Sequence, residues 1–140
     1  MRIRSLNHSR YQHEYHIVWC TKYKRQFLQE YVKPVLIACL FAIIEKYPTL
    51  YIITVNTDKD HVHLQMEIPP NVAVSAVVQK LKMITSIKLR KRFGFIEDMY
   101  LDGNIWSVGY FSSTIGLNEE QIQRYIQKQG EEDLPHDSSF

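Results

Sequence analysis

"TLYIITVNTDKDHVHLQMEIPP", residues 49–70, contains the pattern that decides the fold. Its first part, 49–57, is rich in β-branched and aromatic residues, which favour an extended strand. The residues "DKD" at 58–60 form a short turn, and 61–68 alternates polar with apolar side chains as a half-buried strand does. Two prolines at 69–70 end the sheet. The stretch therefore predicts an antiparallel pair of strands with one face toward a hydrophobic core.

Further elements on both sides of this pair give the order β-α-β-β-α-β. They are a strand at 14–24, a helix at 31–47 that is apolar almost all round and has Pro34 in its first turn, a helix at 72–93, a strand at 105–111, and a last helix with Asn118 as N-cap and Gly130 as its end. The segment 94–104 reads as turns. We therefore predict an α+β fold of the ferredoxin-like (RRM-like) type: an antiparallel sheet, two helices on one face, and an additional C-terminal helix.

Length and composition are those of an ordinary globular protein. The chain has 140 residues, of which 45% are hydrophobic and 23% charged, and its net charge is +2. We expect one domain at 1–130 and an acidic, loosely held tail at 131–140. The longest apolar run, 35–44, is too short to cross a membrane, and the N-terminus lacks the apolar core of a signal peptide. A cytoplasmic protein without a membrane partner is expected.

Two histidines stand one residue apart in the strand 61–68. Because side chains alternate along a strand, the apolar residues from Val62 to Ile68 point toward the helices, and the polar ones from His61 to Glu67 share the open face. Two imidazoles at positions i and i+2 can converge on one metal ion. An isolated His-x-His is more often a solvated polar face, so both interpretations remain open on this pattern alone.

Two acidic residues flank the histidine pair. Asp60 could orient His61 or cap the turn at 58–60, and the turn is the favoured interpretation. Glu67 lies on the same face but farther along the strand, and we interpret it as a solvated charge.

The last helix can supply a third metal donor. Tyr125 and Gln129 are four residues apart and therefore lie on one helical face. Tyr125 could be a half-buried aromatic residue of an amphipathic helix or a nucleophilic phenol. A metal ion bound by His61, His63 and Gln129 would lie one helical turn from Tyr125.

Four segments together resemble a known family. They are "YHIVWCTKYKRQFL" in the first strand, "DHVHLQMEI" at the histidine pair, "WSVGYFSSTIG" in the fourth strand and "YIQKQ" in the last helix. In their order and spacing the chain resembles, from about Tyr11 to Gln129, the His-hydrophobic-His (HUH) single-tyrosine transposases of small bacterial and archaeal insertion sequences, which move as single-stranded DNA.

The resemblance implies a homodimer that cleaves and rejoins single-stranded DNA with a divalent metal, Mg²⁺ or Mn²⁺. His61 and His63 would be the paired ligands, Gln129 the third ligand, and Tyr125 the nucleophile that forms a 5′-phosphotyrosine intermediate. It also implies recognition of hairpin DNA and an active site shared between subunits. The acidic tail after Gln129 and the modest net charge are the departures from this pattern.

Two basic segments are candidates for DNA contacts. Residues 21–27 interleave cations with aromatic side chains, as single-strand binding surfaces do, and 88–93 adds a second run of cations. Charge runs are also common on solvated faces. The candidate phosphate contacts are Lys22, Lys24, Arg25, Lys88, Arg90 and Arg92.

Other functions remain possible on the sequence. A domesticated relative that processes genomic palindromes would use the same residues. A non-catalytic RRM-like nucleic-acid-binding module shares the β-α-β-β-α-β order, although no aromatic pair stands out on the inner strands. A phosphodiesterase with two His-x-Ser/Thr motifs is disfavoured, because only one strand carries a histidine pair.

Overall fold

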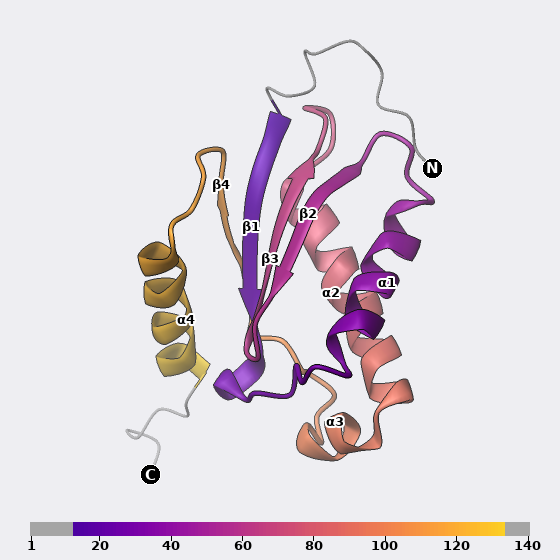
Figure 1. The fold of residues 1–140 in the computed structure, drawn as a ribbon, viewed down its shortest axis with the longest axis vertical. Coiled ribbons are helices and arrows are strands. Elements are labelled where there is room, and N and C mark those ends of the chain that lie inside the picture. Colours follow the sequence, from indigo (N-terminus) through magenta and orange to yellow (C-terminus); the bar gives the residue numbers. More distant parts are fainter. Residues whose placement is uncertain (1–12, 134–140) are drawn as a thin grey trace.

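The computed structural model describes residues 13–133, which form one antiparallel sheet with helices on both faces (Figure 1). The elements are β1 (Glu14–Cys20), the 3-10 helix η2 (Lys22–Lys24), α1 (Lys33–Ile44), β2 (Tyr51–Thr57), β3 (His61–Glu67), α2 (Val74–Arg92), α3 (Gly94–Met99), β4 (Phe111–Ser113) and α4 (Glu119–Asp133). The strand order is β2-β3-β1-β4. The predicted ferredoxin-like α+β fold is confirmed.

The predicted strand pair at 49–70 is present as β2 and β3. Asn56 pairs with His63 and Thr57 with Val62, and the N–H of Asp58 donates to the carbonyl of His61 at 3.0 Å to close the turn. The pairing register of β2 with β3 shifts between Ile52 and Thr54, an irregularity that the sequence pattern did not predict.

Side-chain alternation divides β1 between two apolar clusters. Ile17 and Trp19 belong to the main core beneath α1 and α2, whereas Val18 and Cys20 point to the other face and contact α4. In β3 the apolar side chains from Val62 to Met66 are fully buried in the main core, as predicted. Helices α1 and α2 therefore cover one face of the sheet, and α4 covers β1 on the opposite face (Figure 1).

The first strand is shorter than predicted. It ends at Cys20 instead of continuing to Lys24, because Tyr23 and Lys24 have φ values of 61° and 56°. Positive φ is incompatible with an extended strand, so the chain turns away through η2. The turn directs Phe27 and Leu28 into the core, where both are fully buried.

The fourth strand is displaced along the chain. We predicted it at 105–111, but β4 covers Phe111–Ser113, and the earlier residues form only a single bridge between Trp106 and Thr21. Gly109, with φ of 91°, separates the two stretches. The apolar residues Ile105 and Trp106 that suggested a strand are nevertheless buried in the main core.

Two helical details also differ from prediction. The segment 94–104, predicted as turns, contains α3, whose Ile96 is fully buried. The first two helices are shorter than the predicted 31–47 and 72–93. Pro34 lies at the start of α1, as expected.

Gly130 does not end the last helix. Helix α4 continues to Asp133, and a Cβ at Gly130 would clash with the aliphatic chain of Lys24. The glycine thus permits close approach to η2 where we had predicted a helix stop. The rest of the predicted tail, 134–140, lies outside the described residues. Within residues 13–133, no helix combines the length and the apolar character that crossing a bilayer requires.

Candidate active site

The histidine pair lies beside β1 on the face of the sheet that α4 occupies. His61 pairs with Cys20 and His63 with Val18 across the β1–β3 ladder. Paired residues of an antiparallel ladder project to the same face, so Val18 and Cys20 are the immediate neighbours of the histidines. The face of the sheet that we predicted to be open therefore carries both the histidines and the last helix.

His61 is held by the carboxylate that precedes it. The residue is 6% exposed, and its Nδ1 lies 2.9 Å from Oδ1 of Asp60. A carboxylate can only accept, so Nδ1–H donates and Nε2 keeps a free lone pair. The backbone carbonyl of Asp60 also accepts the N–H of Thr21 at 2.9 Å. The prediction that Asp60 serves mainly the turn is therefore wrong, because its carboxylate orients His61.

His63 is half-buried and favours the neutral form. Desolvation lowers the pKa of His63 below its ordinary value, and the neighbouring His16 and His61 lower it further, against an opposing contribution from Glu119. A neutral imidazole is the form that binds a metal ion. Within residues 13–133, however, no three His, Cys, Asp or Glu side chains lie together in a way that could hold a metal.

Glu67 is not the solvated charge that we predicted. Its side chain is 4% exposed, at the far end of β3 from His61 and paired across the sheet with Glu14 and Tyr51. Its burial is therefore a feature that the alternation of side chains along the strand did not predict.

Helix α4 begins with the predicted cap. Oδ1 of Asn118 accepts the N–H of Gln121 at 2.8 Å, and Oε1 of Gln121 accepts the N–H of Asn118 at 2.9 Å. This reciprocal pair is a capping box. One face of the helix then buries Ile122 and Ile126 against Val18 and Cys20.

Tyr125 packs on the same small cluster. Its ring lies 5.8 Å from that of Phe111, and its hydroxyl is buried without a hydrogen-bond partner among residues 13–133. Desolvation is the main cause that raises the pKa of Tyr125 above its ordinary value. Gln129 is 8% exposed. In the described part of the chain, no hydrogen bond joins Tyr125 or Gln129 to either histidine, although α4 and the histidine pair lie on the same face of the sheet.

Sequence reasoning missed two polar residues around this site. Nδ1 of His16 lies 3.3 Å from Nε2 of His63. Asp133 accepts hydrogen bonds from the N–H of Tyr23, at 2.9 Å, and from Oγ of Ser107, at 2.5 Å, and so fastens the end of α4. Alternation could have placed His16 on the correct face, but only the strand register brings it to His63. No local signal indicated the role of Asp133, which we had assigned to the tail.

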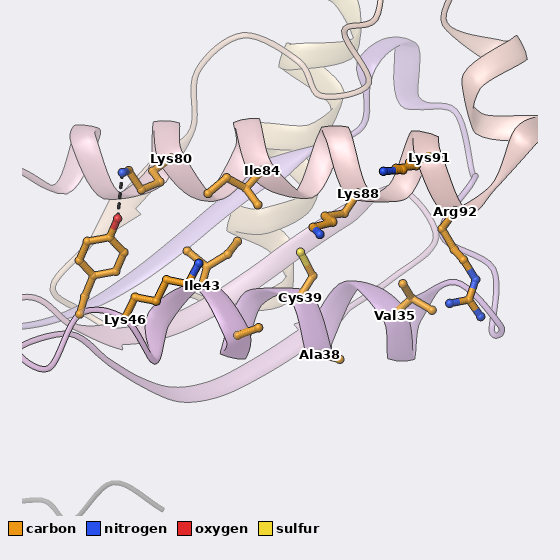
Figure 2. A pocket seen from close by; sticks show the side chains of 12 residues that line it. Val35, Ala38, Cys39, Ile43, Lys46, Lys80, Ile84, Lys88, Lys91 and Arg92 are labelled. Atoms are coloured by element: carbon orange, nitrogen blue, oxygen red, sulfur yellow. Dashed lines mark hydrogen bonds between the residues drawn. The ribbon is translucent and has the colours of Figure 1, made fainter.

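The candidate DNA contacts do not form one patch. Lys88 and Arg92 line a groove of about 860 Å³ between α1 and α2, with an apolar floor that includes Cys39 and Ile43. Figure 2 shows these cations along the α2 side of the groove, where Lys80 also donates to the hydroxyl of Tyr47 at 2.8 Å. The groove faces away from the sheet surface that bears the histidines.

The other basic candidates contact protein groups. Lys22 pairs with Asp102 at 3.1 Å, Arg90 with Glu97 at 3.6 Å, and Arg25 donates to the carbonyl of Met99, while Lys24 packs against Gly130 as described above. Surface ion pairs of this kind are weak, so these side chains can still exchange partners.

Comparisons with known proteins identify a family. The family model described as "Transposase IS200 like" matches residues 9–129. The transposase of insertion sequence IS200 from Salmonella typhimurium is 35% identical over 130 residues, which are 93% of this chain and 85% of that protein. The ISDra2 transposase TnpA of Deinococcus radiodurans is 33% identical over 120 residues, 85% of each chain.

Two solved structures are similar to this fold. A crystal structure from Deinococcus radiodurans R1 described as that of a transposase superposes with a TM-score of 0.72 at 28% identity, covering 83% of this chain and 89% of that one. A REP-associated tyrosine transposase bound to a REP hairpin gives a TM-score of 0.56 at 13% identity, covering 82% and 62% of the two chains. The latter likeness concerns the fold alone.

Proposed function

Since the chain belongs to the IS200-like transposases, a class of enzymes that cut and join DNA, we propose that it cleaves and rejoins single-stranded DNA through Tyr125 and a divalent metal ion. The observation that carries this proposal is the Asp60–His61 hydrogen bond beside His63. It supports a histidine pair on the face where the tyrosine helix packs, in which Asp60 orients the ring of His61 and desolvation favours the neutral form of His63.

The donors present suit a divalent cation. His61 and His63 would hold it, with Gln129 and water oxygens completing the set, and such a mixed set accepts Mn²⁺ readily and Mg²⁺ less tightly. Bound there, the ion would withdraw charge from a phosphate oxygen and favour in-line attack. Within residues 13–133 no third His, Cys, Asp or Glu lies where it could hold an ion together with the pair. The proposal therefore keeps Gln129, one helical turn from Tyr125, as the third donor.

The tyrosine helix must move before it can react. The hydroxyl of Tyr125 is buried over β1, and an unpaired buried hydroxyl is unfavourable. The helix is held there by a small apolar cluster, with Ile122 and Ile126 as its buried members, and by the hydrogen bonds of Asp133. These few contacts support release of α4 toward the histidines of its own subunit or of a partner in a homodimer.

The proposed reaction conserves the energy of the phosphodiester bond. The phenol oxygen of Tyr125 bonds to phosphorus as its proton passes to water, and the bond from phosphorus to the 3′ oxygen breaks. That oxygen takes up a proton from water and leaves as a 3′-hydroxyl. The 5′ end stays on Tyr125 as a phosphotyrosine. Another 3′-hydroxyl can then attack the link and rejoin DNA without ATP, with return of a proton to the phenol.

The groove between α1 and α2 is the surface best suited to hold DNA. Among residues 13–133, its lining includes Lys46, Lys80, Lys88, Lys91 and Arg92, and no carboxylate. A cationic groove suits phosphates, as in a hairpin stem, independently of base sequence. Lys88→Ala should weaken binding to DNA of any sequence and lower the slope of log Kd against log salt concentration by about one unit. The control Lys128→Ala, on the exposed face of α4, should leave that slope unchanged.

A cleavage assay tests the proposal. Labelled single-stranded oligonucleotides from the ends of the element that encodes the protein, with and without hairpins, are incubated with Mn²⁺, Mg²⁺ or chelator, and compared with fully duplex DNA. We expect metal-dependent cleavage of single strands by the wild type and by the control Tyr31→Phe, whose residue is exposed, and none by Tyr125→Phe. Cleavage that persists in Tyr125→Phe, or in chelator, would contradict the proposal. Binding without any cleavage would favour a non-catalytic module.

A further inference from the structure

His16 lies next to the histidine pair although it belongs to another strand. Its Nδ1 is 3.3 Å from Nε2 of His63, and the two ring centroids are 5.5 Å apart at an angle of 44°. His16 shares the face of Val18, the residue that pairs with His63. The contact therefore follows from the β1–β3 register and joins two half-buried side chains.

The other side of the His16 ring faces the loop that leads into α4. In this loop, a Cβ at Gly116 would lie 4.0 Å from Nε2 of His16. In β4, Ser113 pairs with His16 across the sheet. The ring thus lies between His63 and the segment that precedes the tyrosine helix.

A hydrogen bond between two imidazole nitrogens needs one of them as the donor and the other as the acceptor. If Nε2–H of His63 donates to Nδ1 of His16, then Nδ1 of His63 keeps the free lone pair that a metal ligand needs. This arrangement matches that of His61, whose Nδ1–H donates to Asp60 and whose Nε2 remains free. Each histidine of the pair would then have one nitrogen fixed by a protein acceptor and the other available.

We propose that His16 is a positioning residue that accepts a hydrogen bond from Nε2–H of His63 and fixes the ring and tautomer of His63 for metal binding. The inference rests on the proposed metal site and extends it. A hydrogen-bonded outer partner holds a ligand's orientation before the metal arrives, and loss of such a partner commonly weakens metal binding by about 10- to 100-fold.

Mn²⁺ titration calorimetry on the full chain tests this role without any activity measurement. His63→Ala defines the site, His16→Ala removes the acceptor, and His16→Asn is the matched control, because its amide oxygen can occupy roughly the place of Nδ1. We expect the Kd for Mn²⁺ to rise about 10-fold or more in His16→Ala and to return to within about 3-fold of wild type in His16→Asn. Thermal unfolding without metal confirms that each variant is folded.

A second readout needs no metal. Long-range ¹H–¹⁵N spectra of the metal-free protein should show the proton of His63 on Nε2. In His16→Ala the proton should be distributed between Nε2 and Nδ1. Unchanged or tighter Mn²⁺ binding in His16→Ala, or a His63 proton on Nδ1 in the wild type, would overturn the assignment to His16. If wild-type protein does not bind Mn²⁺, or if His63→Ala binds it equally well, the proposed metal site itself fails and the inference fails with it.

Discussion

Tyr125→Phe should make the protein more stable while it removes the proposed nucleophile. The hydroxyl of Tyr125 is buried and has no partner among residues 13–133. Burial of an unpaired hydroxyl costs about 1–3 kcal/mol in proteins, and phenylalanine keeps the ring that packs on Phe111. We therefore expect the free energy of unfolding to rise by about 1 kcal/mol or more, which corresponds to about 3–4 °C in Tm for a chain of this length.

Tyr100→Phe is the matched control for this experiment. The side chain of Tyr100 is 3% exposed, and its hydroxyl donates to the carbonyl of Lys22 at 2.8 Å. Removal of that hydrogen bond should lower the free energy of unfolding by about 1–2 kcal/mol. Urea denaturation of both variants and of the wild type, without metal or DNA, gives the comparison. If Tyr125→Phe is destabilised as much as Tyr100→Phe, the hydroxyl of Tyr125 has a partner in solution and the argument for release of α4 fails.

Three further predictions concern the surroundings of the site. Asp60→Ala should weaken Mn²⁺ binding about 10-fold in calorimetry, because His61 loses the acceptor that orients it, and an unchanged Kd would contradict this. Asp133→Ala removes the acceptor for two donors and should speed amide hydrogen exchange throughout α4, whereas equal exchange rates would show that the contacts do not hold the helix. Burial raises the pKa of the Cys20 thiol from 9.0 to about 11, so the folded form binds more protons than the unfolded form between these values. Stability should therefore fall as pH rises from about 9 to 11, and the fall should be smaller in Cys20→Ala by urea denaturation, while identical slopes would refute the assignment.

Local sequence patterns were sufficient to predict the features that depend only on residues close to one another in the chain. Alternation placed His61 and His63 on the same face of β3, and the cap at Asn118 fixed the start of α4. Both features depend on side chains within a few residues of one another, so a single sequence contains their cause.

Features that depend on distant contacts were not predictable in this way. Gly130 has the appearance of a helix end, but it lies within α4, where the lack of a side chain lets Lys24 pack closely against the helix. The pairing of β1 with β3, which brings His16 to His63, is a matter of register between distant segments. From the sequence, a turn cap was the favoured role for Asp60, and only the side-chain geometry shows that its carboxylate instead orients His61.

A covalent-adduct experiment tests the central claim most directly. Wild-type protein and Tyr125→Phe are incubated with Mn²⁺ and single-stranded DNA that spans the cleavage site and carries its label near the 3′ end. The products are separated on denaturing gels, and the labelled protein is digested for peptide mass spectrometry. The account predicts a metal-dependent labelled protein band whose nucleotide lies on the peptide that contains Tyr125, and no band in the variant. DNA attached to another tyrosine, or cleavage that leaves no protein-bound DNA, would contradict it.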